Sequence, residues 1–234
     1  MRSIHSFLPR DFIATHDDLI FAVLSHHLED NRILAFLRYT HSDGIFHKQD
    51  THAANAYLAQ HRPDYLYDSK ILAARLHAVP VVDISHHYQP SVRLTQLLGD
   101  THSDKVLKTA QDLCQRLVDE GIGLGQLGIT GSLLIGAQHA ASDIDLVVYD
   151  RATFFQTRTA LHRLMGQGVI TELCHTDWLN TYTRRGCALS FEEYVWHEKR
   201  KMNKGIMAGI KFDLSLVLPT NATFPEPAMK SGYH

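Results

Sequence analysis

Hydrophobic residues in the first forty positions gather in short runs separated by polar turns. Leu19–Leu24 and Ile33–Tyr39 are rich in β-branched and aromatic residues, and Phe12–Thr15 is short and apolar. Runs of this kind, bounded by polar clusters such as His16–Asp18, predict β-strands. With the polar stretch His26–Asn31 as the connection between the two longer runs, the pattern predicts an antiparallel meander.

The pattern then changes to one helix followed by less regular segments. Asp50 or Thr51 is placed to cap a helix that runs to about His61, where a proline closes it. Segments 68–79 and 81–97 have helical or mixed patterns that two prolines interrupt. The turn-forming residues Gly99–Thr101 mark the most suitable boundary between two parts of the chain.

The second part alternates helices and strands. Apolar residues at Val106, Ala110, Leu113 and Leu117 have helical spacing, between a cap at Ser103 and a C-terminal glycine. The elements that follow are a strand at Leu127–Thr130, a turn and short helix from Gly131, a strand at Ile144–Tyr149, a helix capped by Asp150, a helix begun by a Ser190–Glu193 capping box, and a strand at Ile210–Leu218.

Together these elements predict an α+β protein in two parts. Residues 1–100 form a strand-rich module of unknown role, and residues 101–234 form a domain with a short mixed sheet. A chain of this length needs no disulfide or metal to fold, and the three cysteines form no close pair.

The composition of the chain limits the classes of binding partner but says little about the reaction. The formal net charge is −2, so no global basic field attracts nucleic acid. No apolar run reaches membrane-spanning length, and the first residues lack a signal-peptide core, so we expect a soluble cytoplasmic protein with no membrane partner. The 17 histidines show no zinc-site spacing, and we expect them at surface positions.

The candidate chemistry lies in two acidic motifs of the second part. Asp143 and Asp145 begin a strand and are two residues apart, so both carboxylates point to one side. A divalent cation relieves the repulsion between them, and Mg²⁺ favours one or two carboxylates with waters and substrate phosphates. On the last predicted strand the side chain of Asp213 points to the face opposite that of Phe212. Three carboxylates therefore converge if this strand lies beside the strand of Asp143 and Asp145.

This arrangement resembles the DNA polymerase β nucleotidyltransferase superfamily. That family has a strand, a Gly-Ser turn, about ten residues, an Asp-x-Asp pair and a third Asp on a later strand, as Gly131, Ser132, Asp143, Asp145 and Asp213 stand here. The resemblance implies that the Asp-x-Asp pair binds Mg²⁺ or Mn²⁺, and that Asp213 completes the catalytic metal site and activates the acceptor. It also implies that the Gly-Ser turn holds a nucleoside triphosphate (NTP).

The resemblance covers about residues 103–218, and a second likeness extends over the whole chain. The chain looks like a group of uncharacterised proteins, many from archaea, described as predicted nucleotidyltransferases. The segments that carry this likeness are Arg10–Thr15, Leu19–Val23, Ala35–Tyr39, Arg75–Pro80 and Gly128–Tyr149. The implied activity is transfer of a nucleoside monophosphate from an NTP to a hydroxyl acceptor, such as a nucleic acid end, a protein or a small molecule.

The basic and the aromatic residues each allow a structural and a functional interpretation. The basic run His197–Lys204 either places cations at a helix C-terminus or clamps phosphates through Arg200 and Lys204, and Arg184-Arg185 is a second basic pair. The aromatic residues of the first part, Phe12 and Phe36 among them, are expected in the core rather than on a base-stacking platform. The alternatives to catalysis are a nucleotide- or partner-binding module of the same fold, and a nucleic-acid-binding protein that uses Lys199–Lys204.

Overall fold

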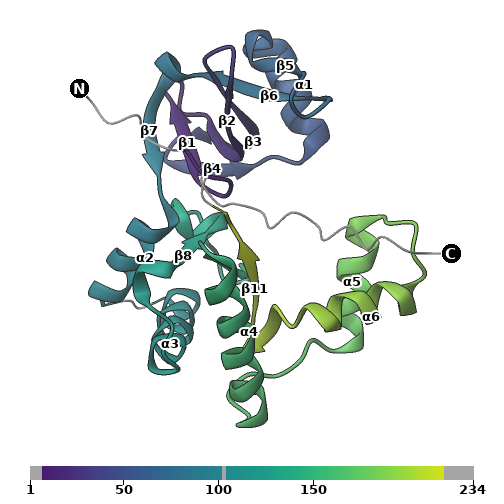
Figure 1. Ribbon diagram of the computed structural model, residues 1–234. Coiled ribbons are helices and arrows are strands. Elements are labelled where there is room, and N and C mark those ends of the chain that lie inside the picture. Colours follow the sequence, from purple (N-terminus) through teal and green to yellow (C-terminus); the bar gives the residue numbers. More distant parts are fainter. Residues whose placement is uncertain (1–6, 102–103, 219–234) are drawn as a thin grey trace, which may run out of the picture.

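The computed structural model describes residues 7–101 and 104–218 and shows two sheets, one above the other in Figure 1. Both helices and strands are abundant, with a strand-rich first part and a smaller mixed sheet in the second, so the predicted α+β class is confirmed. In the described ranges every helix is too short or too polar to cross a bilayer.

The first sheet has seven strands, all paired antiparallel, in the order β5-β6-β3-β2-β1-β7, with β4 against β3. The predicted meander is confirmed as β1–β3. The strands of the whole sheet are β1 (Phe12–Thr15), β2 (Ile20–Glu29), β3 (Arg32–Ser42), β4 (Ile45–Lys48), β5 (Leu66–Ser69), β6 (Ala74–Pro80) and β7 (Ile84–Tyr88).

The connection predicted at His26–Asn31 is wrong in its extent. Strand β2 continues through the polar residues to Glu29, and the turn is only Asp30-Asn31. Both turn residues have positive φ, 50° and 57°. Asn and Asp tolerate this conformation, which the tight two-residue hairpin requires.

One face of the first sheet is covered by α1 (Thr51–His61). Of the two predicted caps, Asp50 is the one that accepts a hydrogen bond, from the Ala53 N–H. Ala54 and Leu58 of this helix pack on apolar side chains of the sheet. His77 on β6 is fully buried there, contrary to the expected surface position, and its Nδ1 accepts a hydrogen bond from the Leu37 N–H.

Of the two segments predicted as helical or mixed, 68–79 is mostly strand, whereas 81–97 is mixed as predicted, with a short strand followed by a helix. A β5–β6 hairpin and β7 occupy this region, and a helix begins only at Pro90. Strand β6 is buried on both faces over Leu76–Val79, so it shows no alternation of apolar and polar residues. Without that alternation a short apolar run cannot be assigned to helix or strand from the sequence.

The second sheet has the order β10-β11-β9-β8, with β9 and β11 parallel and the other pairs antiparallel. Its elements are β8 (Leu127–Thr130), β9 (Ile144–Val148), β10 (Lys204–Met207), β11 (Ile210–Leu216), α2 (Pro90–Gly99), α3 (Lys105–Asp119) and α4 (Arg151–Gly166). Strands β9 and β11 end one and two residues before the predicted ends. The three helices pack on the sheet in one core.

Helix α2 precedes the predicted boundary near residue 100, yet its Leu94 and Leu97 lie in the core of the second sheet. The division at residue 100 therefore stays a prediction. The cap predicted at Ser103 lies outside the described residues, and α3 is instead capped by Asp104, which accepts hydrogen bonds from the N–H groups of residues 106 and 107.

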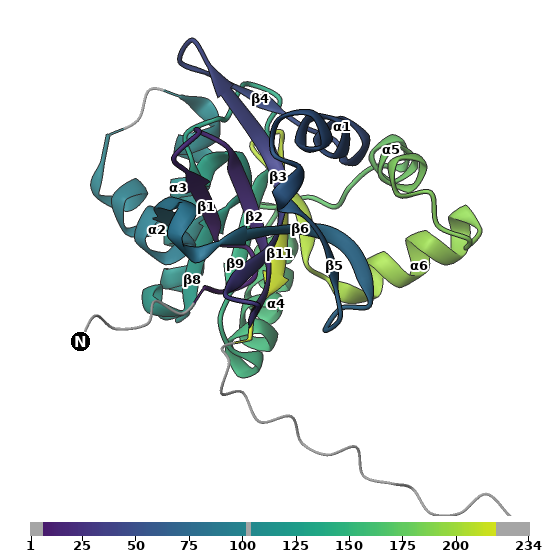
Figure 2. The same cartoon turned by 90° about the horizontal axis from the view of Figure 1, so that it is seen from above.

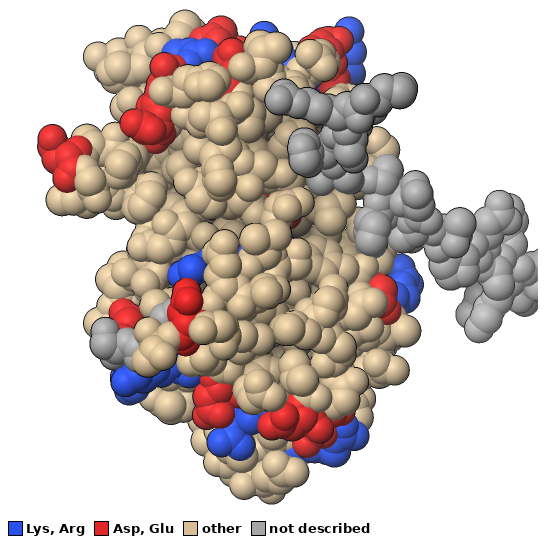
Figure 3. Space-filling model, turned by 90° about the vertical axis from the view of Figure 1, so that its left-hand side faces the viewer, with Lys and Arg blue, Asp and Glu red and all other residues tan. Residues whose placement is uncertain are grey.

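Helices α5 (His175–Arg185) and α6 (Phe191–Lys201) form a pair that projects to the right of the second sheet in Figure 1. The view from above in Figure 2 shows the same pair at the side of the molecule, and Ile206 of β10 packs against its apolar residues. The predicted Ser190–Glu193 capping box begins α6. On the face drawn in Figure 3, basic and acidic side chains of the described residues alternate in small groups.

Candidate functional site

The three predicted carboxylates meet at one end of the second sheet. Strand β11 runs parallel to β9 with Asp213 directly opposite Asp145, and Asp143 lies just before β9. Phe212 and Leu214 point into the core, so Asp213 points to the other side, as the alternation predicted. All three aspartates line one small pocket of about 100 Å³.

The carboxylates are held where negative charge is costly. Burial is the main cause that raises the pKa of Asp145 to about 6, and the charges of Asp213 and Asp143 raise it further. Arg10 and Lys48 act in the opposite direction. Burial also raises the pKa of Asp213, against the nearby cations Lys204 and Arg10. The site therefore favours a bound cation, which would remove this cost.

Gly131 lies directly against the Asp145 carboxylate. A Cβ atom at this position would be 2.2 Å from Oδ2 of Asp145, and the φ of Gly131 is +67°. Only glycine accommodates both the contact and the backbone angle. The short helix predicted after this residue is a single turn of 3₁₀ helix over Gly131–Leu134, and Ser132 is half-buried within it.

Lys204 and Asn203 hold Asp213 in place. Asn203 Nδ2 donates a hydrogen bond to Asp213 Oδ1 at 3.0 Å, and Lys204 Nζ lies 3.7 Å from Asp213 Oδ2. Lys204 also pairs with Glu198, which is 4% exposed. This buried carboxylate on α6 thus fixes the lysine that faces Asp213.

Arg200 does not lie in this pocket. Its guanidinium stacks over the ring of Trp196, 4.3 Å from the ring centre. Lys199 pairs with Glu172, and Lys201 pairs with Glu198, so most of the basic run is already neutralised. The structure brings in Arg184 instead, from the last turn of α5, together with Lys211.

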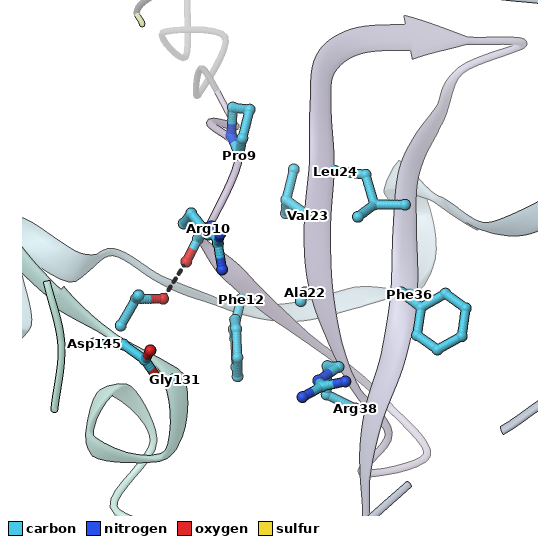
Figure 4. Close-up of a pocket in the computed structure, with 11 residues that line it drawn as sticks. Pro9, Arg10, Phe12, Ala22, Val23, Leu24, Phe36, Arg38, Gly131 and Asp145 are labelled. Atoms are coloured by element: carbon cyan, nitrogen blue, oxygen red, sulfur yellow. Dashed lines mark hydrogen bonds between the residues drawn. The ribbon is translucent and has the colours of Figure 1, made fainter. Parts of the chain in front are cut away.

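A second, larger pocket of about 520 Å³ lies on the other side of Asp145, between the two sheets. Figure 4 shows Asp145 and Gly131 facing Arg10, in the turn before β1, and Phe12 and Arg38 of the first sheet. The Oγ1 of Thr130, at the end of β8, donates a hydrogen bond to the backbone carbonyl of Arg10 at 2.6 Å. Sequence reasoning missed Arg10 and Arg38, because no local spacing connects the first sheet to β8.

The donor set fits magnesium through two carboxylates rather than three. Among the described residues, no group of three or more His, Cys, Asp and Glu side chains is arranged to hold a metal ion. Asp213 is engaged by Asn203 and Lys204, whereas the Asp145 carboxylate accepts no hydrogen bond from the described part of the chain. Asp143 and Asp145 with substrate phosphates match the usual mode of Mg²⁺ binding.

Comparison with known proteins identifies one relative and no function. The chain is 28% identical to the uncharacterized protein MJ1086 of Methanocaldococcus jannaschii, over 88% of this chain. The chain spans 66% of the length of that protein. No family model matches the chain, and no solved structure matches it.

Proposed function

We propose that this protein is an Mg²⁺-dependent nucleotidyltransferase that moves a nucleoside monophosphate from an NTP to a hydroxyl acceptor and releases pyrophosphate. The observation that supports this most is the register of the second sheet. It places Asp213 beside Asp145 and next to Asp143, while Gly131 presses on the Asp145 carboxylate. Three carboxylates at the start of such a strand pair suit in-line transfer at a phosphate.

Asp143 and Asp145 would hold Mg²⁺ or Mn²⁺, with NTP phosphates completing the shell. The ion would supply charge neutralisation on the reacting phosphates. The absence of a side chain at Gly131 lets its backbone lie against the Asp145 carboxylate, so phosphates bound at this turn would lie beside the metal ligand, and the Ser132 hydroxyl provides a donor on the same turn. This gives the Gly-Ser turn the role of binding the β- and γ-phosphates.

Asp213 is suited to receive the proton of the acceptor hydroxyl. Burial raises the pKa of this carboxyl, which brings it closer to the working pH of a general base. As the proton passes to Asp213, the acceptor oxygen bonds to the α-phosphorus, and the bond to the bridging oxygen of pyrophosphate breaks. Asn203 and Lys204 keep the carboxylate oriented during this step.

One observation favours a second candidate, a nucleotide-binding module without turnover. The described residues offer no ready three-carboxylate metal site, and Asp213 is tied to Lys204 and Asn203. The nucleic-acid-binding alternative has less support, because Lys199 and Lys201 are paired with glutamates and Arg200 is stacked on Trp196.

The test of the proposed function is pyrophosphate release. We would incubate the protein and Mg²⁺ with each NTP and with RNA ends, proteins and small polyols as acceptors. We expect release that falls by at least a hundredfold in Asp145→Ala and Asp143→Asn. The matched control is Asp68→Asn, an exposed carboxylate on β5. Unchanged product formation in Asp145→Ala would contradict the proposed function, and NTP binding without any pyrophosphate release would favour the binding module.

A further inference from the structure

The pocket between the two sheets carries chemistry that the three carboxylates do not explain. Its volume of about 520 Å³ is in the range of pockets that bind small molecules. One wall comes from the first sheet, with Phe12, Leu24 and Phe36, and the other holds Gly131 and Asp145. The pocket therefore joins the module of unknown role to the proposed catalytic carboxylates.

Two arginines face this pocket without a hydrogen-bond or ion-pair partner within the described ranges, and the charge of Arg10 acts on Asp145 and Asp213. Among the described residues, the guanidinium groups of Arg10 and Arg38 make neither a hydrogen bond nor an ion pair. Both line the same cavity, in which Asp145 is the one acidic residue of its described lining. Unpaired guanidinium groups in a concave site are suited to bind phosphate oxygens, often through two parallel hydrogen bonds.

The backbone at Arg10 is held in an unfavourable conformation. Its φ is +78°, in the left-handed region that side chains rarely adopt. The Thr130 hydroxyl donates to the Arg10 carbonyl, and the Arg10 N–H donates to the Val23 carbonyl at 3.1 Å. Strain that the surrounding structure maintains is typical of ligand sites.

Irregularities in β2 and β3 shape the same wall. Phe21 pairs with Leu37 but Ile20 pairs with Tyr39, so Arg38 is the extra residue of a β-bulge. A longer irregularity in β2 begins after Val23, and Leu24 at its start is 45% exposed and lines the pocket. Bulges re-aim side chains beside functional sites. Here they are associated with a guanidinium and an aliphatic side chain at the same cavity.

We propose that the first sheet forms the nucleotide pocket, in which Arg38 and Arg10 bind the polyphosphate of an NTP and the apolar wall receives its base. Asp145 and Gly131 at the pocket edge place the phosphates beside the carboxylates. Phe12 is 5% exposed and lies beneath the wall, so the base packs against the half-buried Phe36 and the exposed Leu24. The acceptor then approaches from the opposite side, where Asp213 and Arg184 lie. This inference rests on the proposed function only for the identity of the ligand.

The experiment is equilibrium binding by calorimetry in Mg²⁺, with α,β-methylene NTP analogues that cannot transfer and with inorganic triphosphate. We compare the wild type with Arg38→Gln and Leu24→Ser. The matched control is Arg75→Gln, an exposed arginine on β6 of the same sheet with no hydrogen bond or ion pair in the described residues. Thermal melting of each variant checks the fold.

We expect Arg38→Gln to weaken binding of the NTP analogue and of inorganic triphosphate by roughly tenfold or more, with partial recovery in Arg38→Lys. Leu24→Ser should weaken the NTP analogue severalfold and leave inorganic triphosphate unchanged. Arg75→Gln should change neither. Equal affinities for Arg38→Gln and Arg75→Gln would overturn the inference.

The outcome separates this inference from the proposed transfer activity. Binding that depends on Arg38 but yields no pyrophosphate with any acceptor would support the nucleotide pocket and remove the proposed enzyme. Pyrophosphate release with unchanged NTP affinity in Arg38→Gln, and a raised KM for the acceptor, would keep the enzyme and overturn the pocket assignment. Failure of the wild type to bind either probe would overturn both.

Discussion

Replacing Asp145 by asparagine should make the metal-free protein more stable at alkaline pH. The ionised carboxylate is buried beside Asp213 and Asp143, and its pKa is raised to about 6 from 3.8. At 1.36 kcal/mol for each tenfold change, this difference corresponds to about 3 kcal/mol at pH 8. Asparagine has nearly the same shape and no charge, so Asp145→Asn should gain up to this amount.

The sign follows from proton binding. Because the folded-state pKa of Asp145 is raised, the folded chain binds more protons than the unfolded chain between pH 3.8 and about 6. The stability that protonation provides below pH 3.8 is therefore lost as the pH rises through 6. The advantage of Asp145→Asn should shrink to about 1 kcal/mol at pH 4.5.

The assay is denaturant unfolding in EDTA at pH 4.5 and 8, with thermal melting as a second measurement. For a chain of this size each kcal/mol shifts Tm by about 2–4 °C. The control is Asp150→Asn. Hydrogen bonds from Thr153 lower the pKa of Asp150 at the start of α4, so its loss should not stabilise the protein at pH 8. An Asp145→Asn variant less stable than the wild type at pH 8 would refute the reasoning, as would a gain that is independent of pH.

Three other variants probe the surroundings of the site. Gly131→Ala should abolish pyrophosphate release and lower stability by about 1–2 kcal/mol, because its Cβ would strike Asp145 Oδ2 at a positive φ; normal activity would show that the contact is unimportant. Lys204→Met should cost about 3 kcal/mol in urea unfolding, since it leaves Glu198 without its Lys204 partner in a buried position; a neutral result would mean that Lys201 suffices. Burial lowers the pKa of His77 to about 4, so wild-type stability falls as the pH drops from 6.5 to 4. The stability gap between the wild type and His77→Gln should therefore narrow between pH 7.5 and 5, and parallel pH profiles would argue against this.

The sequence contained most of the information needed to place the carboxylates. The two apolar strands that carry Asp145 and Asp213 were identified together with the side to which each aspartate points, whereas their pairing was assumed and its parallel direction was not predicted. The helix caps at Asp50, Asp150 and Ser190 were also predictable, because capping depends on residues three positions apart. Side-chain alternation and helix capping were predictable because both depend on contacts between residues that are close in the sequence.

The first sheet was harder to predict because its determinants are long-range. Strand β2 continues through exposed polar residues that the sequence pattern assigns to a connection. The burial of β6 on both faces removes the alternation that identifies a strand. The Arg10 carbonyl accepts a hydrogen bond from Thr130, which is 120 residues away in the chain, and no local pattern reveals this contact.

The basic run at the C-terminal end of α6 shows a different limit of prediction from sequence. Its charge and its closeness in sequence to Asp213 favoured Arg200 and Lys204 equally. The structure separates them, because Trp196 one turn earlier stacks with Arg200 while Lys204 begins β10 opposite Asp213. The side chain that each cation meets depends on tertiary packing, which the order of charges does not show.

The most direct test of the central claim is calorimetric titration of the wild type and the Asp143→Ala/Asp145→Ala double variant with Mg²⁺ and each of the four NTPs. The account predicts metal-dependent NTP binding in the wild type that vanishes in the double variant, with a preferred base that guides the search for the acceptor. NTP binding that is equally strong in both proteins would contradict the account, because it would place the nucleotide away from the carboxylates.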